Sequence, residues 1–413
     1  MTRAELIALT DLSRKSLPSI EQEETRVSAL RAIAKALVEN EDTILKANAY
    51  DVSVAREKGV REAMIDRLSL TKEKLATIAE AVNAVADLPS PTVLDREYTH
   101  KNGMIIRRYR VPLGVVGMIY EARPNVTVDA AALCLRSGNA CLLRGGSEAF
   151  ASNKALVSVM REAIASVGVD ENAVTILEDL SHETVDTLLS LRGHIDLVIP
   201  RGGKGLIRRV VENAAVPVIE TGAGNCHVYV HESADIPMAV RILDNAKTQR
   251  PSVCNAAETL LCDEKIAKDF LPLAKKALDL HNVEWRGCEK TCAILNGIAA
   301  ATEEDYDTEY NDYVLSVKVV SDVDEAIAHI ARYSTRHSEC IVAENEDAVK
   351  RFFSRVDAST LYHNASTRFT DGGEFGLGAE IGISTQKLHA RGPFALEALT
   401  TTQYRVYGNG ETR

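Results

Sequence analysis

Residues 115–144, VVGMIYEARPNVTVDAAALCLRSGNACLLR, contain two short apolar runs, VVGMIY (115–120) and ACLLR (140–144), separated by a segment long enough for a helix. The alternation continues with AVTILE (173–178) and IDLVIP (195–200). Short apolar runs that alternate with helical segments are typical of parallel strands covered by helices on both faces. The stretch therefore predicts an α/β lobe built on a doubly wound, Rossmann-type parallel sheet.

Composition narrows the class of protein. The chain has 413 residues, more than one hydrophobic core usually supports, so two lobes are expected. The net charge of -11 includes no basic block, which argues against nucleic acid as a partner. The sequence has neither a secretory leader pattern nor an apolar window long enough to cross a membrane, so we expect a cytoplasmic enzyme without membrane contact.

The segments outside this lobe have other patterns. The first 90 or so residues have helical periodicity, and Ser19 with Gln22 predicts a capping box. KNGMIIRRYRV (101–111) has the pattern of an extended segment after a Gly turn, and TTQYRV (401–406) has the pattern of a strand in the tail. Because protruding strands often complete a neighbouring subunit's sheet, we expect a homo-oligomer.

Glycine pairs follow two of the expected strands. Arg144-Gly145-Gly146 ends the run 140–144, and Arg201-Gly202-Gly203 follows IDLVIP and leads into a helical stretch. Helix starts at the carboxyl ends of parallel strands bind phosphates, although such glycines also simply close turns. The GxGxxG and GxxxxGK[ST] fingerprints are absent, so a nucleotide would bind in a less common manner.

Eight cysteines occur at irregular spacings, which fits neither a disulfide framework nor paired zinc knuckles. Cys134, Cys141 and Cys262 lie in apolar patterns typical of core thiols. Cys254 lies in QRPSVCNAAETLL, after a Pro and a polar run and before Ala-rich residues that can start a helix. Its position makes it a candidate nucleophile, one of several until a further criterion is applied.

Further motifs carry a resemblance to a known family. They are LGVVGMIYEARPNVT (113–127), SGNACLLRGGSEA (137–149), VIETGAG (218–224), CNAAETLL (254–261) and EYNDYVLSVK (309–318). Their order resembles that of the aldehyde dehydrogenase superfamily. The stretches 320–341 and 375–393 are not shared by general aldehyde dehydrogenases and are similar to the gamma-glutamyl phosphate reductase family within it. The resemblance covers nearly the whole chain.

The resemblance implies an aldehyde dehydrogenase-like α/β fold with three parts. These are a nucleotide-binding domain over 1–97 and 113–223, a catalytic α/β domain over 224–389, and a small β oligomerisation arm from 98–112 and 390–413. It also implies NADPH-dependent reduction of L-glutamyl 5-phosphate to L-glutamate 5-semialdehyde with release of phosphate, in proline biosynthesis. The chain contains no kinase lobe, which leaves open a transient contact with glutamate 5-kinase.

Carried over position by position, the resemblance makes Cys254 the nucleophile and matches Glu220 to the glutamate that activates water in oxidising relatives. Glu309 resembles the glutamate that holds the nicotinamide ribose. Arg144, Gly145, Gly146 and Ser147, with Arg201, Gly202 and Gly203, are the expected cofactor contacts. Ser147 stands near the place of an acid that favours NAD, so NADPH is expected.

This chain departs from the superfamily where the usual Trp-Asn pair is replaced by Glu121, Ala122, Arg123, Pro124 and Asn125. Asn125 is the expected oxyanion donor because its amide N–H can face a developing negative charge, with Arg123 as the alternative. For the anionic groups of the substrate we expect contacts from Ser366, Thr367 and Arg368, with Arg123 and His337 as second choices. A metal is not expected.

Two alternatives remain open. An oxidising, non-phosphorylating aldehyde dehydrogenase or an acyl-coenzyme A reductase would share Cys254 and the fold, and would differ in not releasing inorganic phosphate. A catalytically silent nucleotide-binding scaffold would leave Cys254 no more reactive than an ordinary exposed thiol.

Overall fold

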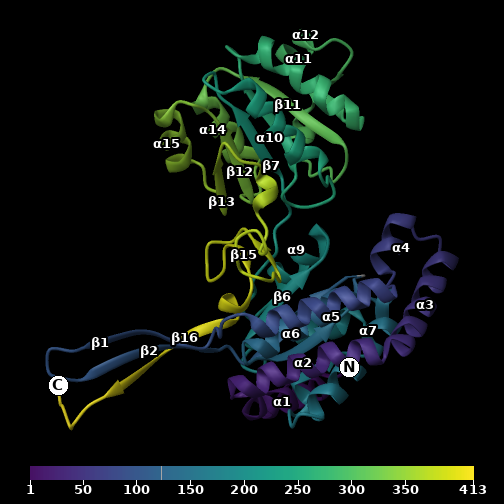
Figure 1. The fold of residues 1–413 in the computed structure, drawn as a ribbon, viewed down its shortest axis with the longest axis vertical. Coiled ribbons are helices and arrows are strands. Elements are labelled where there is room, and N and C mark those ends of the chain that lie inside the picture. The colour runs from purple at the N-terminus through teal and green to yellow at the C-terminus, as the bar shows by residue number, and fades with distance from the viewer. Residues whose placement is uncertain (122) are drawn as a thin grey trace. The chain divides into compact units, whose positions relative to one another are not determined.

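The computed structural model describes residues 1–121 and 123–413, which divide into two compact units (Figure 1). Unit 1 comprises Met1–Glu220, Leu377–Gly382 and Phe394–Arg413, and unit 2 comprises Thr221–Gly376 and Ile383–Pro393. Each unit contains a parallel sheet with helices, as the sequence predicts. The functional roles assigned to the three predicted parts stay predictions. By their contacts, residues 98–112 of the predicted arm belong to unit 1. Of the predicted arm segment 390–413, the residues up to Pro393 belong to unit 2 and Phe394–Arg413 belong to unit 1.

Unit 1 begins with helices only. They are α1 (Arg3–Ser16), α2 (Glu23–Glu39), α3 (Glu41–Glu57), α4 (Glu62–Leu68) and α5 (Lys72–Asp87). α2 buries Leu30 and Leu37, and α5 buries Leu75 and Val82, so the predicted helical stripes are confirmed as core faces.

The predicted capping box at Ser19 and Gln22 is wrong. Ser19 lies in a 3-10 turn, Leu17–Ile20, and its hydroxyl donates to the carbonyl of Ser16 at 2.7 Å. Gln22 is the N-cap of α2 but makes no side-chain cap. Pro18 favours the start of this turn, which delays the helix to Glu23. A capping box does form at α1, between Thr2 and Glu5.

The central sheet of unit 1 has the order β5-β4-β3-β6 with all strands parallel. The strands are β3 (Val115–Tyr120), β4 (Ala140–Arg144), β5 (Val174–Ile176) and β6 (Leu197–Arg201), and the helices between and after them are α6 (Pro124–Arg136), α7 (Phe150–Ala165), α8 (His182–Leu189) and α9 (Lys204–Asn213). The four strands predicted from apolar runs are thus confirmed, with β5 and β6 shifted by one or two residues. β3, the first strand along the chain, lies between β4 and β6, so the winding direction reverses beside it.

A separate three-stranded antiparallel sheet extends from unit 1 (Figure 1). It joins β1 (Leu94–Thr99), β2 (Ile105–Pro112) and β16 (Thr400–Tyr407) in the order β1-β2-β16. Gly103, at φ +94°, allows the turn between β1 and β2. The predicted hairpin and tail strand are confirmed, and they pair with each other within one chain over eight register positions.

Unit 2 has a seven-stranded parallel sheet in the order β10-β9-β11-β8-β7-β12-β13. Its strands are β7 (Cys226–Val230), β8 (Ala257–Asp263), β9 (Glu284–Gly287), β10 (Ala299–Ala300), β11 (Val314–Val320), β12 (Ser338–Val342) and β13 (Thr360–His363). Its helices are α10 (Ile236–Thr248), α11 (Ala267–Leu278), α12 (Glu289–Ile294), α13 (Glu303–Tyr306), α14 (Val323–Tyr333) and α15 (Glu346–Arg355). A short pair, β14 (Gly382–Ser384) with β15 (Gly392–Phe394), lies where the chain passes between the units.

Two apolar cores flank the sheet of unit 2. Leu243 of α10 and Phe270 of α11 pack with β7, β8 and β11 on one face. Ile330 of α14 and Phe352 of α15 pack on the other face. Because β8 is covered on both faces, all seven of its residues are buried, including Glu258, Thr259 and Asp263. This doubly covered sheet is the rigid support for the loops at its edges.

Candidate active site

Cys254 lies in the turn that joins α10 to β8, at the amino-terminal edge of the sheet of unit 2. The expectation that a helix follows Cys254 is wrong, because Ala257 already begins β8. Pairing of β8 with β7 on one side and β11 on the other overrides the helical preference of the alanines. Cys254 as a residue is half-buried.

Burial separates Cys254 from most of the other cysteines. Five thiols are buried, namely Cys134, Cys141, Cys226, Cys262 and Cys340, and the three core thiols predicted from sequence are among them. Burial raises the pKa of the Cys340 thiol to about 12 and also raises the pKa of Cys226 and Cys262. These thiols are therefore protonated at neutral pH and poor nucleophiles.

Gly224 packs directly against the turn that carries Cys254. A Cβ added at Gly224 would lie 1.4 Å from the carbonyl oxygen of Cys254, so only glycine fits there. The backbone N–H of Gly224 donates to the Glu309 carboxylate at 2.6 Å. Glu309, predicted as a ribose contact, thus belongs to the same cluster as Cys254. Its carboxylate keeps acceptor capacity beyond this one bond.

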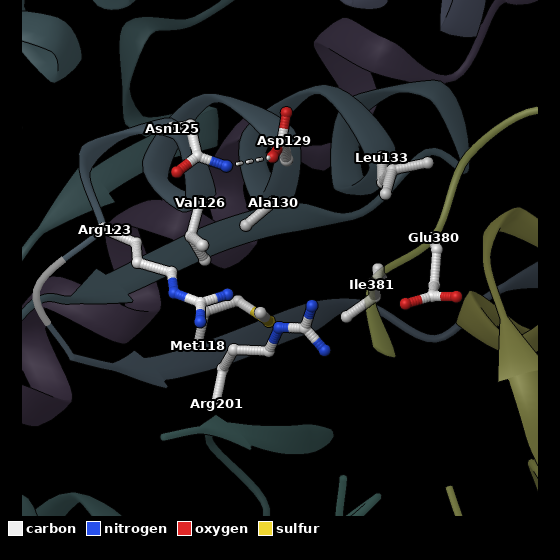
Figure 2. A pocket seen from close by; sticks show the side chains of 10 residues that line it. All are labelled: Met118, Arg123, Asn125, Val126, Asp129, Ala130, Leu133, Arg201, Glu380 and Ile381. Atoms are coloured by element: carbon white, nitrogen blue, oxygen red, sulfur yellow. Dashed lines mark hydrogen bonds between the residues drawn. The ribbon is translucent and has the colours of Figure 1, made fainter. Parts of the chain in front are cut away.

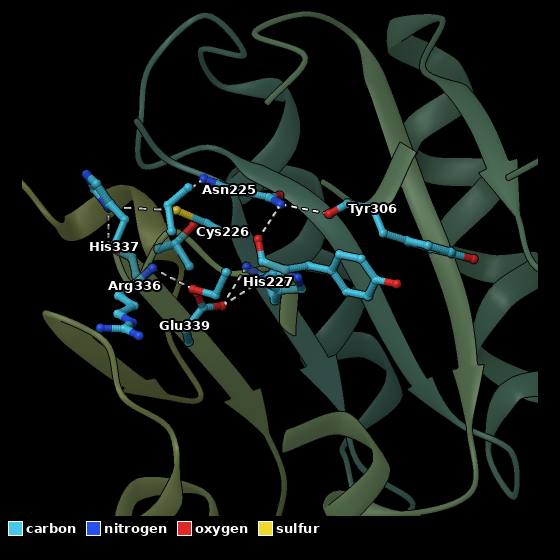
Figure 3. Close-up of polar contacts among 12 residues, drawn as sticks. Asn225, Cys226, His227, Tyr306, Arg336, His337 and Glu339 are labelled. Atoms are coloured by element: carbon cyan, nitrogen blue, oxygen red, sulfur yellow. Dashed lines mark hydrogen bonds and ion pairs between the residues drawn. The ribbon is translucent and has the colours of Figure 1, made fainter. Parts of the chain in front are cut away.

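The start of β7 contacts the same turn through Cys226, which Figure 3 shows beside His337. The Cys226 thiol donates to the Cys254 carbonyl at 3.2 Å. The neighbouring His227 is held through its backbone N–H, which donates to Glu339 at 2.8 Å across the β7–β12 pair. The carbonyl of Cys254 is therefore fixed by a buried strand, which limits the freedom of the turn.

A buried ion pair holds the segment that carries Glu309. The ammonium of Lys247 and the carboxylate of Glu258 lie 2.5 Å apart with both side chains fully buried. Glu258 also accepts the backbone N–H of Asn311 at 3.1 Å, where the chain has a left-handed φ of 54°. Burial lowers the pKa of Lys247 and raises the pKa of Glu258, so each group depends on the other for its charge.

The loop 366–368 is bound to Asn255, the residue that follows Cys254. Thr367 donates its hydroxyl to the Asn255 carbonyl at 2.7 Å, and the Asn255 amide donates to the Thr370 carbonyl at 2.9 Å. The Arg368 guanidinium donates to Gln249 at 2.8 Å and to the Asn255 side chain. Ser366, Thr367 and Arg368, predicted as substrate contacts, are therefore brought to the turn of Cys254.

Two arginines and Cys254 interact electrostatically. Burial, and next the nearby Arg250 charge, lower the pKa of Arg368, whereas Cys254 raises it. A cationic environment favours the thiolate form of a cysteine and the binding of an anionic group. Sequence reasoning missed Arg250, Gln249 and Asn255. Their closeness in sequence to Cys254 was the only available signal.

His337, a second choice for substrate binding, has a fully buried ring. Its Nδ1 lies 2.8 Å from the Ser338 hydroxyl and 3.7 Å from the Cys226 sulfur. Burial lowers the pKa of His337 to about 4, so the ring is neutral near pH 7. These contacts argue for a packing role and against a cationic contact with phosphate.

In unit 1, Arg123, Asn125 and Arg201 line one cavity (Figure 2). Arg123 precedes α6, Asn125 lies in its first turn, and Arg201 ends β6. The Asn125 amide donates to Asp129 at 3.1 Å. Ala122, within the run that replaces the Trp-Asn pair, lies outside the described residues. Glu220 is half-buried and is the last residue of the first segment of unit 1.

The glycine turn after β6 is already engaged by a carboxylate, and another carboxylate lies at the start of α7. The Gly203 N–H donates to Glu121 at 2.9 Å, and a Cβ on Gly202 would lie 2.7 Å from the same carboxyl group. At the start of α7, Asp51 accepts the Ser152 N–H at 2.7 Å. A phosphate at the start of α9 must therefore displace Glu121, a competition that the sequence did not reveal.

The turn after β4 contains two buried glycines followed by an exposed serine. Gly145 is required because a Cβ there would lie 2.2 Å from the Asn153 side chain. Gly146 is buried and leads into the exposed Ser147. The half-buried Arg144 guanidinium donates to the Leu180 carbonyl, and its Nε has no hydrogen-bond partner among the described residues. Arg144 is thus held at the turn by this hydrogen bond.

The described part of the chain has neither a metal cluster nor a helix suited to a membrane. Residues 1–121 and 123–413 contain no group of three or more His, Cys, Asp or Glu side chains placed to hold a metal ion. Within the same residues, none of the helices combines the length and apolar composition that crossing a bilayer requires.

Comparison with known proteins agrees with this arrangement. Residues 7–290 match the family model described as the aldehyde dehydrogenase family. The acetylating aldehyde dehydrogenase of Geobacillus thermoglucosidasius has a TM-score of 0.70 at 16% identity, covering 100% of this chain and 98% of that one, a likeness of fold alone. The chain belongs to the aldehyde dehydrogenase family, and the predicted fold class is confirmed.

The relatives with high sequence identity to this chain carry one name. Gamma-glutamyl phosphate reductase of Clostridium perfringens (strain SM101 / Type A) is 56% identical over 387 residues, 94% of this chain and 93% of the relative. That of Carboxydothermus hydrogenoformans is 56% identical over 391 residues, 94% of each. The crystal structure of gamma-glutamyl phosphate reductase from Thermotoga maritima has a TM-score of 0.97 at 49% identity, covering 99% of this chain and 100% of that one. The predicted resemblance is confirmed.

Proposed function

We propose that this chain reduces L-glutamyl 5-phosphate to L-glutamate 5-semialdehyde with NADPH and releases phosphate, as a step of proline biosynthesis. The proposal rests on one observation above others. The chain is 56% identical over 94% of its length to relatives named gamma-glutamyl phosphate reductase. The half-buried Cys254, which interacts with the charge of Arg368, supplies chemistry that fits this reaction.

In the proposed reaction the Cys254 thiolate attacks the acyl carbon and phosphate leaves with the bonding electrons, which gives a thioester. Arg368 and Arg250 favour the thiolate and offset the charge of the departing phosphate. Ser366 adds a hydroxyl donor. Phosphate leaves readily as an anion, so the step needs no strong general acid.

Asn125 remains the proposed oxyanion donor, together with the backbone N–H of Cys254. The second half of the reaction converts the thioester to a thiohemiacetal, which collapses to the aldehyde and regenerates the Cys254 thiolate. Water must be excluded until then, because hydrolysis of the thioester would return glutamate. Glu220 is therefore proposed as an orienting carboxylate with no required role as a base.

NADPH fits the residues at the ends of β4 and β6. Arg144 supplies a half-buried guanidinium cation, and the exposed Ser147 carries no negative charge that would repel a 2'-phosphate. Gly145, Gly146, Gly202 and Gly203 allow close approach of the backbone, and Glu309 would accept from the nicotinamide ribose. When bound, the nicotinamide supplies the hydride.

The partners proposed are the small acyl phosphate substrate and further copies of this chain. The sheet β1-β2-β16 has two outer strands with free edges on which a neighbouring subunit could pair. A transient contact with glutamate 5-kinase would protect the labile acyl phosphate. Eight cysteines without a disulfide are consistent with a reducing cytoplasm.

The reverse reaction tests this proposal against its near alternative. With L-glutamate 5-semialdehyde and NADP, formation of NADPH should require inorganic phosphate and should saturate with it. An oxidising aldehyde dehydrogenase would turn over without phosphate, and an acyl-coenzyme A reductase would require coenzyme A in its place. Either of these results would refute the proposed reaction.

A further inference from the structure

A closed ring of hydrogen bonds includes the turn that carries Cys254. On one side of the ring the Cys226 thiol donates to the Cys254 carbonyl at 3.2 Å, and His337 Nδ1 lies 3.7 Å from the Cys226 sulfur. The same Nδ1 lies 2.8 Å from the Ser338 hydroxyl. Figure 3 shows the His337 ring directed toward Cys226, with this contact drawn as a dashed line.

The other side of the ring returns to the residue that follows Cys254. The Ser338 hydroxyl lies 2.7 Å from the Thr370 hydroxyl, and the Thr370 carbonyl accepts the Asn255 side-chain amide at 2.9 Å. The ring therefore closes on the peptide between Cys254 and Asn255 and holds that peptide at both ends. Its members, all in unit 2, are Cys254, Cys226, His337, Ser338, Thr370 and Asn255.

Most of the ring is shielded from water. Cys226, His337, Ser338 and Thr370 are fully buried, and Asn255 is 5% exposed. Water cannot replace a hydrogen bond that is lost at such a position, so each buried donor or acceptor that loses its partner destabilises the arrangement. Buried networks of this kind favour one set of side-chain positions. The ring is therefore able to hold the turn of Cys254 in one conformation.

The contacts of the ring determine where His337 carries its proton. The Cys254 carbonyl can only accept, so the hydrogen of the Cys226 thiol points to it and the sulfur presents its lone pairs to His337. Nδ1 must then be the donor. A proton on Nε2 would instead be a buried donor without an acceptor, since Nε2 has no partner among the described residues. Burial lowers the pKa of His337 to about 4, so near pH 7 the ring carries this one proton.

The proton on Nδ1 also sets the direction of the hydroxyl groups. Because Ser338 accepts from Nδ1, its own hydroxyl hydrogen is directed to Thr370. The Thr370 hydroxyl then donates to the phenol oxygen of Tyr362 at 2.8 Å. Two branches thus start at His337. One reaches the Cys254 carbonyl through Cys226, and the other reaches Asn255 through Ser338 and Thr370.

We propose that His337 is a positioning residue for the nucleophile Cys254 and acts through the proton on Nδ1. The assignment rests on the proposed function, in which Cys254 attacks the acyl carbon, and it needs no contact between His337 and the substrate. The ring keeps the turn close to Arg368, whose guanidinium donates to the Asn255 side chain and interacts with Cys254. Without the ring the turn can shift, which slows attack and leaves binding of the substrate largely unchanged.

Two substitutions of His337 test the position of the proton. An Asn side chain can place its amide N–H where Nδ1 lies, whereas a Gln side chain reaches the position of Nε2. In His337→Asn, kcat with L-glutamate 5-semialdehyde, NADP and phosphate should stay within about threefold of wild type. In His337→Gln, kcat should fall at least about tenfold, with less than a threefold change in either KM. His281→Gln, an exposed histidine outside the ring, is the control and should leave all values unchanged.

Cys226→Ala tests the same path from its other end, and it decides the matter if His337→Gln does not fold by circular dichroism. It removes the donor to the Cys254 carbonyl, so kcat should fall at least about tenfold. Because both changes break one path, the double variant should lose no more than about twofold beyond the larger single loss. Unchanged kcat in Cys226→Ala would overturn the assignment, and so would equal losses in His337→Asn and His337→Gln or fully multiplied losses in the double variant.

A second readout does not depend on turnover. The rate at which iodoacetamide alkylates Cys254, followed by the mass of its peptide, should fall at least about threefold in Cys226→Ala and stay unchanged in His337→Asn. A shifted turn moves the thiol away from the Arg368 charge, which favours the thiolate. Wild-type protein without phosphate-dependent turnover would refute the proposed function. In that case a slower alkylation in Cys226→Ala would still support the positioning role, and an unchanged rate would overturn it.

Discussion

Replacing Gly224 by alanine tests how the turn that carries Cys254 is held in position. The added Cβ would lie 1.4 Å from the Cys254 carbonyl oxygen, whereas ordinary contact requires 3.4 Å. One of the two segments must therefore move by about 2 Å (3.4 − 1.4). A displacement of about 1 Å at reacting groups can cost about 100-fold in rate, so we expect kcat to fall by at least that factor, equivalent to about 2.7 kcal/mol in the barrier.

The assay is phosphate-dependent formation of NADPH from the semialdehyde, with circular dichroism to confirm folding. Gly222→Ala is the matched control, because its Cβ would meet only the side chain of Thr385, at 2.5 Å, and never the backbone of Cys254. We expect it to lose about tenfold less activity than Gly224→Ala. The reasoning is refuted if Gly224→Ala folds normally and keeps more than a third of the wild-type kcat.

Four further predictions concern single residues. Cys254→Ser should fold with an unchanged unfolding temperature and lose at least about 1000-fold in kcat, because a hydroxyl is hardly ionised at neutral pH; substantial turnover contradicts covalent catalysis. Lys247→Met should lower the free energy of unfolding in urea by about 3–5 kcal/mol by leaving Glu258 buried without its partner, and Lys247→Met with Glu258→Leu should recover most of the loss; a neutral single variant contradicts this. Asp129→Asn should raise the free energy of unfolding at pH 7.5 by up to about 3 kcal/mol, because the folded-state pKa is raised from 3.8 to about 6. The cost of ionising the buried group builds up between pH 3.8 and about 6, and the gain should vanish below about pH 3, where the group is protonated in both states; a gain that is equal at both pH values contradicts this reasoning. Glu121→Gln should lower the KM for NADPH about threefold by removing the negative charge that competes with a cofactor phosphate at the Gly203 N–H, and a raised KM would place the phosphate elsewhere.

Local patterns predicted the strands of unit 1 well. VVGMIY and ACLLR became β3 and β4 with the predicted ends, because strands buried on both faces must be apolar at every position. The tail strand was also predictable, but its partner was not. That β16 pairs with β2, almost 300 residues earlier in the chain, depends on tertiary contacts that no local pattern records.

Predictions at element boundaries were weaker. The residues after Cys254 favour a helix by composition, yet β7 and β11 draw them into a strand. Ser19 and Gln22 match a capping box by spacing, yet Pro18 keeps Ser19 in a separate turn. In both places a neighbouring element or a fixed backbone angle decided the outcome over intrinsic preference.

The chemistry around Cys254 was predictable in part. Motifs brought Cys254, Glu309 and Arg368 to notice, and the structure brings all three to one turn. The hydrogen bond from Asn255 to Thr370 and the hydrogen bond from Gly203 to Glu121 both join residues far apart in sequence. Asp129 and Glu380 carry no motif, and only the cavity that they line with two arginines singles them out.

The central claim is that Cys254 carries the acyl group and that phosphate is the natural partner for its exchange. The most direct measurement is the mass of the intact protein after mixing with L-glutamate 5-semialdehyde and NADP in the absence of phosphate. The account predicts one equivalent of NADPH per active subunit and one glutamyl group on Cys254, which phosphate then discharges. Continuous turnover without phosphate, or a glutamyl adduct that also forms in Cys254→Ser, would contradict it.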